Sequence, residues 1–396
     1  MNKEIKQAVI LAGGRGLRLR ALTEDTPKPM VLVNGRPFLD YLFELLKKNA
    51  IQEVVLLLGY LPEKIVSYVG NGSSFGLNIK YSIGAVEDGT GSRIRNAEEL
   101  LNETFLLLYC DNFVHLDLGK LVEFHETNGR LATVTVYTNK YGITKNNIFV
   151  DEKGFVTKYD KTRLDPTLNG VDLGFFLLSK ELLKLMPKEN FYLEEVILPK
   201  LIKMRELVGF KTDQIYYSIG NPERLKTAEL FLDPARKAVF LDRDGVVNKK
   251  MPPGEYIKKW SEFEFLPGVK EAMSMLTKSG FEIYIVSNQA GIGRGVMQEG
   301  DLLEMHNNME KELLADGCRI SAFYYCPHDF EGNCQCRKPK PGMLFQAALE
   351  HCIDLPRATF IGDDERDVEA GVAAGCRTEL VGPSRNLLSV VKELIS

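Results

Sequence analysis

The sequence predicts an α/β protein with two domains, each a mostly parallel sheet flanked by helices. The chain of 396 residues is longer than one ordinary hydrophobic core requires, which favours two domains. Short apolar segments of the buried-strand type alternate with longer segments of helical periodicity along most of its length. Because strands that alternate with helices usually pair in parallel, we expect one sheet in residues 1–233 and another in residues 234–396.

The first half contains apolar runs typical of buried strands, separated by amphipathic segments. The predicted strands are residues 8–12, 54–58, 79–83, 105–108, 131–137 and 171–178. The predicted helices are residues 37–49, 91–101, 117–128, 193–204 and 222–232. We place the domain boundary at Asp233-Pro234, because the residue before a proline disfavours helix.

The second half repeats the same alternation. The predicted strands are residues 238–241, 281–286, 321–325 and 358–361, and the predicted helices are residues 268–279, 301–315, 342–352 and 365–374. No low-complexity segment separates the halves, so we expect a short connection between them.

Composition restricts the classes of function. Hydrophobic residues make up 44% of the chain and charged residues 26%, as in soluble globular proteins. A net charge of -4 argues against nucleic acid or anionic membranes as main partners. No apolar run approaches the roughly 18 residues that span a bilayer, and the charged segment Met1–Gln7 is unlike a signal peptide. We therefore expect a cytoplasmic protein with reduced cysteines.

Two aspartates follow the first predicted strand of the second half. Asp242 and Asp244 are two positions apart, so their side chains should point to the same side of an extended segment. Carboxylates at the carboxyl end of a parallel strand suit a site for Mg²⁺ and a phosphate. The alternative is an aspartate-containing turn, and this pair alone does not decide between the two.

Three later features strengthen the first interpretation. Ser287 ends the second predicted strand with a hydroxyl that can bind a phosphate oxygen. Arg337 and Lys338 lie just before a predicted helix, where an anion is already favoured. Asp363 follows the last predicted strand. Each feature is common in turns or loops, but all of them in this order indicate phosphoryl transfer.

The second half resembles the haloacid dehalogenase superfamily of phosphohydrolases in its capless form, and more narrowly the heptose-bisphosphate and histidinol-phosphate phosphatases. The resemblance implies that Asp242 attacks phosphorus and carries an aspartyl-phosphate. Asp244 would act as the general acid and base. Ser287 and Lys338 would hold the phosphoryl oxygens. Mg²⁺ would bind Asp242, the backbone carbonyl of Asp244, and Asp363.

The resemblance also bears on the substrate. Gly291-Ile292-Gly293-Arg294-Gly295 is similar to the heptose enzymes, whereas the short spacing from His328 to Cys334 is similar to the histidinol-phosphate type, so both substrates stay open. We assign Arg294, Arg337 and Asn288 to substrate binding, with Arg294 gripping a distal phosphate or sugar hydroxyls. The superfamily places a cation directly after the last acid, where this chain has Asp364. That departure concerns the local metal geometry and not the reaction.

Three cysteines and one histidine cluster in residues 326–336. They are Cys326, His328, Cys334 and Cys336. Such a set satisfies tetrahedral Zn²⁺ and leaves no open position, and free surface cysteines are the alternative. In the resembled families this zinc is structural and shapes the substrate loop.

The first predicted strand of the chain ends in a glycine-rich segment, Leu11-Ala12-Gly13-Gly14-Arg15-Gly16-Leu17-Arg18-Leu19. This is not the dinucleotide-binding fingerprint, because Leu19 occupies the position of its third glycine. Together with Lys28 in Thr26-Pro27-Lys28-Pro29-Met30, the two arginines make a cationic cradle for a triphosphate.

Residues 7–232 resemble the sugar-1-phosphate nucleotidylyltransferases, in particular the heptose-1-phosphate and mannose-1-phosphate guanylyltransferases. The resemblance implies a nucleotide site with Leu11, Ala12, Gly13 and Gly14 at the base and ribose, Arg15, Arg18 and Lys28 at the phosphates, and Gly89 at the base or sugar. It further implies that Asp111 holds Mg²⁺ and that Lys161 and Asn169 contact the sugar phosphate. That sugar phosphate would attack the α-phosphorus in line, with no covalent intermediate.

This half departs from the family pattern in three places. Leu17 stands where the family has Thr, and Cys110-Asp111-Asn112 replaces its Gly-Asp pair. Ser218 stands where the family has a second metal-binding Asp. With one carboxylate fewer, metal binding should weaken unless another acid helps, and Asp172 is the candidate.

The two halves fit one reaction sequence. Removal of the distal phosphate from a heptose 1,7-bisphosphate leaves a sugar 1-phosphate, which is the acceptor that a nucleotidylyltransferase needs. We therefore expect a bifunctional enzyme of nucleotide-activated heptose synthesis that uses GTP, serves cell-surface polysaccharide such as lipopolysaccharide, and makes the α anomer by analogy. One alternative keeps the phosphatase and makes the first half a non-catalytic binding module. Another changes the substrate to histidinol phosphate. The oligomeric state and channelling between the sites stay open.

Overall fold

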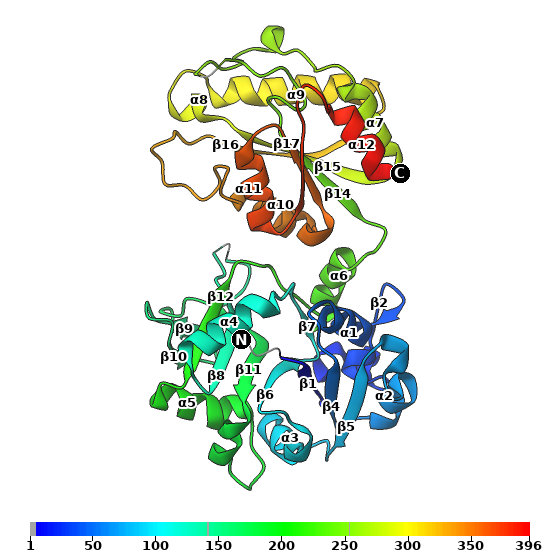
Figure 1. The fold of residues 1–396 in the computed structure, drawn as a ribbon, viewed down its shortest axis with the longest axis vertical. Helices are drawn as coiled ribbons and strands as arrows, with labels where there is room; N and C mark the ends of the chain where they lie inside the picture. The colour runs from blue at the N-terminus through cyan, green and yellow to red at the C-terminus, as the bar shows by residue number, and fades with distance from the viewer. Residues whose placement is uncertain (1–4, 141, 253) are drawn as a thin grey trace. The chain divides into compact units, whose positions relative to one another are not determined.

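The computed structural model describes residues 5–140, 142–252 and 254–396, and the chain folds into two compact units (Figure 1). The first unit ends at Leu230 and the second begins at Phe231. Each unit has its own central sheet and its own hydrophobic core. The expected α/β class, with a mostly parallel sheet in each half, is confirmed.

The described part of the first unit has a seven-stranded sheet in the order β12-β8-β11-β6-β1-β4-β5. Its strands are β1 (Gln7–Ala12), β4 (Glu53–Leu58), β5 (Asn78–Ile83), β6 (Thr104–Tyr109), β8 (Ala132–Tyr137), β11 (Val171–Ser179) and β12 (Leu207–Thr212). All neighbours pair in parallel except β11, which is antiparallel to both β6 and β8. The central strand β1 is apolar from Ala8 onward because it is buried on both faces.

Helices and short strands complete the first unit. The α-helices are α1 (Phe38–Lys48), α2 (Pro62–Val69), α3 (Thr90–Asn96), α4 (Leu118–Asn128), α5 (Leu198–Met204) and α6 (Pro222–Phe231). The short strands form the pairs β2 (Leu32–Val33) with β3 (Arg36–Pro37), β7 (Asn112–Phe113) with β13 (Tyr217–Ser218), and β9 (Ile148–Val150) with β10 (Val156–Tyr159). The pairing of β7 with β13 brings two segments that are far apart in the sequence side by side at the carboxyl end of β6.

The second unit has a five-stranded, fully parallel sheet in the order β16-β15-β14-β17-β18. Its strands are β14 (Lys237–Leu241), β15 (Phe281–Asn288), β16 (Ile320–Cys326), β17 (Thr359–Gly362) and β18 (Arg377–Leu380). Its α-helices are α7 (Val269–Lys278), α8 (Ala290–Gly293), α9 (Glu299–Ala315), α10 (Gly342–His351), α11 (Glu365–Ala374) and α12 (Leu387–Ile395). Phe240 on the central strand packs against Tyr284 and Phe360 on its two neighbours, with ring centroids 5.5 and 6.4 Å away.

Both sheets reverse their strand order at one central strand, and this positions the candidate sites. In the first unit β1 lies between β6 and β4, and in the second unit β14 lies between β15 and β17. Ligands of open α/β sheets bind beyond the carboxyl end of the strand where the order reverses. The glycine-rich segment follows β1 and Asp242 follows β14, so the two motifs occupy equivalent topological positions.

Several elements differ from the sequence-based expectation. The strands β12 and β18 were not expected: β12 contains Gly209, and β18 is a short edge strand with the polar sequence Arg-Thr-Glu-Leu. The helices α2 and α12 were also missed. The helix expected over 193–204 begins as a π-helical turn, Leu193–Ile197, before α5. The two strands are short or mixed in composition, whereas α2 and α12 are amphipathic but span only eight and nine residues. Helical periodicity is recognised with most certainty over about 11–18 residues.

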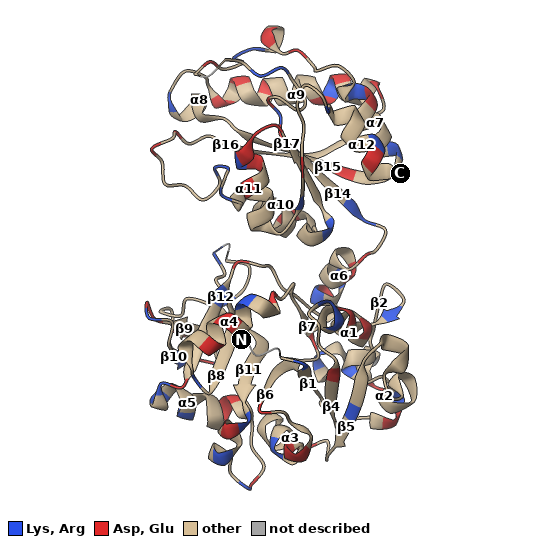
Figure 2. Cartoon of the chain, in the orientation of Figure 1, with Lys and Arg blue, Asp and Glu red and all other residues tan. Residues whose placement is uncertain are grey.

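Charge is distributed without separation by sign. Lys and Arg alternate with Asp and Glu along the helices and loops of both units (Figure 2). Among the described residues, no helix is both long enough and apolar enough to cross a membrane.

Candidate active sites

The loop after β14 turns sharply and carries both aspartates of the second unit. Asp242 follows the last residue of β14, and its backbone N–H donates to the carbonyl of Ile361 on β17 at 3.0 Å. Gly245 has a φ of 102° and lies against the Asp363 carboxylate, where an added Cβ would come within 2.3 Å of Oδ2. Only glycine combines that backbone conformation with that close approach. The turn therefore brings Asp242 next to the acid that follows β17.

A buried lysine links two acids at the floor of this site. Lys338 Nζ lies 2.8 Å from Oδ1 of Asp242 and 2.7 Å from Oδ1 of Asp367, and it also donates to the carbonyl of Val286 at 3.1 Å. Lys338 is 4% exposed and Asp242 is 7% exposed. Burial raises the pKa of Asp242, the Lys338 ammonium opposes that rise, and Asp367 adds to it. The structure thus brings Asp242, predicted as the nucleophile, into contact with Lys338, predicted to bind the phosphoryl oxygens.

Asp244 is held by hydrogen bonds from four side chains, the longest of them donated by the Ser287 hydroxyl at 3.4 Å. Its carboxylate accepts from the neighbouring Arg243 at 2.9–3.2 Å, from Asn248 Nδ2 at 3.0 Å and from Gln289 Nε2 at 3.0 Å. Burial alone would raise the pKa of Asp244, but Arg243, Asn248 and Gln289 together lower it. The side chain is fixed next to the nucleophile as a carboxylate, a position that suits an acid and base.

Ser287 and Asn288 end β15 with different partners. The Ser287 hydroxyl accepts from Gln289 Nε2 at 2.6 Å and lies 3.4 Å from Oδ2 of Asp244. Asn288 exchanges two hydrogen bonds of 3.1 Å with the backbone of Lys338. Both residues line the pocket, but the Asn288 side chain is used to position Lys338. Substrate binding by Asn288 stays a prediction.

The acids of the second unit fit a divalent cation. Oxygens of Asp242, Asp363 and Asp367 lie within 4.8 Å of one another. Within the described residues, Oδ1 of Asp363 is buried and has no hydrogen-bond partner, as expected of an atom reserved for a metal. Asp367 was not among the predicted metal ligands, and its oxygens are already bound by Lys338 and by the backbone N–H groups of Asp363 and Asp364. Asp242 and Asp363 would therefore hold Mg²⁺, with Asp367 fixing both the loop and Lys338.

A pocket of about 520 Å³ lies over these acids. Phe330 lines it and is 60% exposed. The guanidinium of Arg337 lies 4.3 Å from the centre of the Phe330 ring, and that of Arg294 lies 5.9 Å from it. Arg294 also donates to the Tyr256 hydroxyl at 3.3 Å. The two arginines predicted to bind substrate are thus brought together around one aromatic ring next to the pocket.

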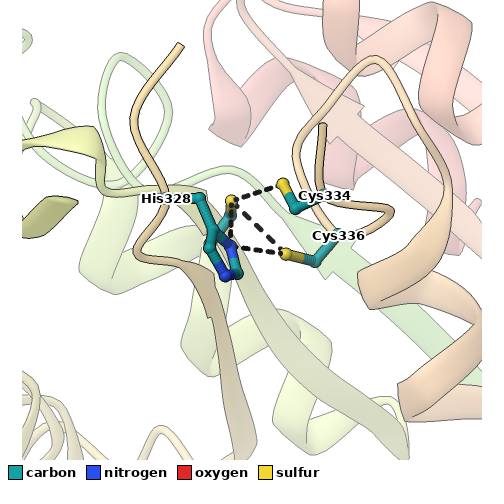
Figure 3. Close-up of side chains that lie close together, drawn as sticks. His328, Cys334 and Cys336 are labelled. Carbon is teal, nitrogen blue, oxygen red and sulfur yellow. Dashed lines mark hydrogen bonds between the residues drawn. The ribbon is translucent and has the colours of Figure 1, made fainter. Parts of the chain in front are cut away.

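The Cys/His cluster converges as expected. From Cys326 Sγ the distances are 3.5 Å to His328 Nδ1, 3.6 Å to Cys334 Sγ and 3.4 Å to Cys336 Sγ, and Cys336 Sγ lies 3.3 Å from His328 Nδ1 (Figure 3). Ligands about 2.3 Å from a tetrahedral zinc would be about 3.8 Å apart. The cluster needs only a small expansion to accept a metal ion. Lys338 follows it by two residues, so a metal ion in the cluster would anchor the segment that carries this cation.

In the first unit, a pocket of about 510 Å³ lies at the end of β1. The predicted nucleotide and metal residues that line it are Leu11, Gly13, Gly14, Arg15, Arg18, Lys28 and Asp111. The buried Arg93 supports this segment from below, with hydrogen bonds to the carbonyls of Leu58 and Ala85 at 2.7 Å. An added Cβ on Gly13 would come within 2.3 Å of the Arg93 guanidinium. The glycine is therefore required by a buried arginine that the sequence did not single out.

Ala12 and Gly89 are not among the described residues that line this pocket. Ala12 is buried in β1 and pairs with Leu58. An added Cβ on Gly89 would come within 2.1 Å of the carbonyl oxygen of Phe191. Glycine is needed there by the protein's own backbone. Contacts of both residues with the nucleotide stay predictions.

Asp111, the residue of the first unit that is predicted to hold Mg²⁺, is paired with a lysine. Lys28 Nζ makes an ion pair with Oδ2 of Asp111, and both side chains are largely buried. Ser218 pairs with Asn112 across β13 and β7, and the N–H of Ile219 donates to the carbonyl of Asp111 at 3.0 Å. Ser218 thus lies next to Asp111, where its hydroxyl accepts from the N–H of Gly220 at 3.1 Å. One carboxylate with phosphate oxygens is a common Mg²⁺ ligand set, so Asp111 fits the ion.

The predicted sugar-phosphate residues have partners within the protein, and their contacts with substrate stay predictions. Lys161 pairs with Glu195 at 3.1 Å, and its Nζ lies 5.5 Å from the centre of the Tyr192 ring, which lines the pocket at the end of β1. The Asn169 amide exchanges two hydrogen bonds of 2.9 Å with the backbone of Val150. Asp172 accepts from the Tyr159 hydroxyl at 3.0 Å and from the N–H of Gly174 at 2.7 Å, and burial raises its pKa to about 6. Asp172 is not among the described residues that line the pocket of Asp111, so nothing supports it as a substitute metal ligand.

Sequence reasoning missed several residues of the two sites. In the second unit they are Arg243, Gln289, Lys250 and Tyr256, and in the first unit they are Arg93, Tyr109 and Thr90. Arg243 and Gln289 could have been suspected, because each directly follows or lies within two residues of a predicted catalytic residue. The others come from distant segments that only the fold brings to the pockets.

Comparison with known proteins relates each unit to a family of enzymes. Residues 7–232 match the family model described as nucleotidyl transferase, and residues 335–385 match the one described as HAD-hydrolase-like. The D-glycero-beta-D-manno-heptose-1,7-bisphosphate 7-phosphatase of Rhodopseudomonas palustris is 38% identical over 149 residues, which are 36% of this chain and 81% of that protein. The corresponding alpha-specific phosphatase of Campylobacter jejuni is 40% identical over 142 residues, 36% of this chain and 80% of that protein.

A solved structure is similar to the first unit in size and fold. HddC from Yersinia pseudotuberculosis matches with a TM-score of 0.50 and 26% identity, covering 57% of this chain and 98% of that one. The chain therefore belongs to the nucleotidyl transferase family through residues 7–232 and to the heptose-bisphosphate phosphatases of the haloacid dehalogenase superfamily through its second unit.

Proposed function

We propose that this chain catalyses two successive reactions of nucleotide-activated heptose synthesis. The second unit removes the 7-phosphate of heptose 1,7-bisphosphate. The first unit then transfers a nucleotidyl group to the resulting heptose 1-phosphate and releases pyrophosphate. The observation that carries the proposal is the ion pair of Asp242 and Lys338 under one pocket, with Asp363 beside it. Asp363 offers a carboxylate oxygen within 4.8 Å of one of Asp242, and among the described residues its buried Oδ1 has no hydrogen-bond partner. We infer that the sugar is a heptose from the names of the similar phosphatases. We infer the order of the two reactions from the presence of both units in one chain.

In the phosphatase reaction, an Asp242 oxygen attacks phosphorus and the bond from phosphorus to the sugar oxygen breaks. The Lys338 ammonium and the Ser287 hydroxyl bind the phosphoryl oxygens, and a Mg²⁺ ion held by Asp242 and Asp363 would offset their charge. Asp244 gives a proton to the leaving oxygen and then accepts one from the water that hydrolyses the aspartyl-phosphate. Because Asp244 rests as a carboxylate, we expect the negative charge of the bound phosphate to raise its proton affinity.

In the nucleotidyl transfer, an oxygen of the sugar phosphate attacks the α-phosphorus as pyrophosphate leaves. Arg15, Arg18 and Lys28 neutralise the triphosphate, and Asp111 would hold the Mg²⁺ ion that accompanies it. Catalysis here consists of positioning and charge neutralisation. GTP and the α anomer follow from the resemblance to guanylyltransferases. We place both reactions in the cytoplasm and their product in cell-surface polysaccharide such as lipopolysaccharide.

A second candidate function concerns the first unit alone. Ser218 lies next to Asp111 in the place of a second carboxylate, which favours a module that binds nucleotide or sugar phosphate without turnover. The retained cations and Asp111 around the pocket support turnover instead.

The first test supplies the full chain with Mg²⁺, heptose 1,7-bisphosphate and each nucleoside triphosphate in turn, and follows phosphate, pyrophosphate and sugar nucleotide. We expect phosphate in every case and pyrophosphate with GTP only. Asp242→Asn should lower phosphate release by at least about 10³-fold, because a carboxamide cannot attack phosphorus. The same variant should still release pyrophosphate from GTP when given heptose 1-phosphate. Phosphate without pyrophosphate from any triphosphate would establish the binding-module alternative.

Loss of Arg294 should weaken binding of the bisphosphate selectively. A charge-assisted hydrogen bond to phosphate contributes about 1.5–3 kcal/mol, so Arg294→Ala should raise KM for heptose 1,7-bisphosphate about 10- to 100-fold. Hydrolysis of p-nitrophenyl phosphate, which has no distal phosphate, should be unchanged. Arg319→Ala removes an exposed arginine outside the pocket and is the matched control. Equal effects on the two substrates would contradict the role of Arg294.

Removal of the metal from the Cys/His cluster should affect the phosphatase alone. We expect one zinc ion per chain by elemental analysis, and its loss in Cys336→Ser. Because the cluster anchors the segment that carries Lys338, the variant should lose phosphatase activity and retain nucleotidyl transfer. Cys352→Ser, outside the cluster, is the control. Full phosphatase activity in a zinc-free protein would show that the metal has no structural role.

Restoring a second carboxylate should strengthen Mg²⁺ binding in the first unit. Ser218→Asp places an acid next to Asp111, and we expect the Mg²⁺ concentration for half-maximal nucleotidyl transfer to fall about ten-fold. Ser218→Asn has the same size without the charge and should show no such decrease. If the two variants behave alike, Ser218 does not occupy a metal position.

A further inference from the structure

Lys250, which has no role in the reaction proposed above, contacts Asp363, the carboxylate that would hold Mg²⁺ in the phosphatase site. Lys250 lies two residues after Asn248, and its Nζ is 2.7 Å from Oδ2 of Asp363 and 3.7 Å from Oδ2 of Asp364. Arg366 binds Asp364 through two hydrogen bonds of 2.8 and 2.9 Å. Lys250, Asp364 and Arg366 all line the pocket over Asp242. Cations from two different segments therefore balance the acids that follow β17.

The contact of Lys250 distinguishes the two oxygens of Asp363. Oδ2 accepts from Lys250, whereas Oδ1 is buried and, within the described residues, has no hydrogen-bond partner. The carboxylate also packs against Gly245, where an added Cβ would come within 2.3 Å of Oδ2. The lysine and the glycine together fix which oxygen stays free.

The backbone next to Lys250 is anchored to the same site. Asn248 is fully buried, and its amide donates to Asp244 at 3.0 Å and to the carbonyl of Lys249 at 2.9 Å. The N–H of Lys249 donates to the carbonyl of Glu264 at 2.9 Å. Lys250 is therefore presented to Asp363 from a fixed point of the chain.

We propose that Lys250 is a positioning residue of the phosphatase site. It holds Oδ2 of Asp363 and so leaves Oδ1 available to a magnesium ion, and its charge offsets Asp364 next to the incoming phosphate. The inference rests on the proposed function, since it concerns the Mg²⁺ that the phosphatase reaction requires. Hydrogen bonds to metal-ligating carboxylates orient the ligands, and their loss weakens metal binding about 10- to 100-fold.

Orientation of Asp363 and simple charge repulsion predict opposite changes in Mg²⁺ affinity when Lys250 is replaced. If Lys250 orients Asp363, removal of its ammonium weakens Mg²⁺ binding. If Lys250 is only a nearby positive charge, removal of that charge strengthens the binding of another cation. The sign of the change in affinity therefore distinguishes a positioning residue from an incidental ion pair.

The experiment titrates MgCl₂ into the full chain by isothermal calorimetry without substrate. Lys250→Met keeps the length of the side chain and removes its donor, and we expect about ten-fold weaker binding. Lys250→Arg retains donor and charge and should remain near the wild-type affinity. Lys249→Met is the matched control, because Lys249 is an exposed neighbour paired with Glu264 at 3.5 Å. Thermal unfolding of each variant verifies that the fold is retained.

Both units are expected to bind Mg²⁺, so the calorimetric heat contains two contributions. The part that is lost in Asp363→Asn is the heat of Mg²⁺ binding to the second unit. If Asp363→Asn and the wild type give the same isotherm, the magnesium site of the proposed function is absent, and with it the basis for the inference. If they differ and Lys250→Met binds Mg²⁺ as tightly as the wild type or more tightly, the role of Lys250 is overturned while the phosphatase site stands. Weaker binding in Lys250→Met, with affinity retained in Lys250→Arg, supports the proposal.

Discussion

The second unit depends on one buried ion pair network, in which Lys338 bridges Asp242 and Asp367. Two carboxylates this close and this buried would repel each other without a cation between them, and removing one partner of a buried pair typically costs about 3–5 kcal/mol. The surrounding structure keeps the lysine in place: Asn288 holds its backbone, and a metal ion in the Cys/His cluster would anchor the chain two residues before it. The same cation that stabilises the loops is thus placed where a phosphoryl group would bind.

The two units place different chemistry at the same position of an α/β sheet. In each, a central strand lies where the strand order reverses, and its carboxyl end delivers the site. After β1 the chain offers backbone and cations to a triphosphate, whereas after β14 it offers carboxylates to one phosphoryl group. In both units a lysine contacts the acid that we propose as a metal ligand, Lys28 at Asp111 and Lys250 at Asp363. Charge balance within each pocket is therefore supplied partly by the protein before any metal ion binds.

Residue patterns in the sequence predicted the strands and the loops that follow them, because the buried central strands are short, apolar runs that end in glycine or acid. They also predicted the Asp242–Lys338 pair and the Cys/His cluster, because acids, cations and thiols at these spacings are typical of phosphoryl-transfer and zinc sites. They could not predict Lys250, Arg93 or Tyr256, since long-range folding alone brings these side chains to the pockets. Asn169 shows the limit of a motif match in another way, because its amide is hydrogen-bonded to the backbone of Val150. Sugar recognition in the first unit therefore stays a prediction from the motif.

We infer from the fusion of the two units that they act in series on one sugar phosphate, with the phosphatase first. The most direct test follows heptose 1,7-bisphosphate and GTP by ³¹P NMR in the presence of the full chain and Mg²⁺. We expect the 7-phosphate signal to be lost before or together with conversion of the 1-phosphate into a diphosphate diester. In Asp242→Asn the 7-phosphate should persist and little diester should form. A sugar nucleotide that still carries its 7-phosphate, formed as fast in the variant as in the wild type, would contradict the order and the dependence of one unit on the other.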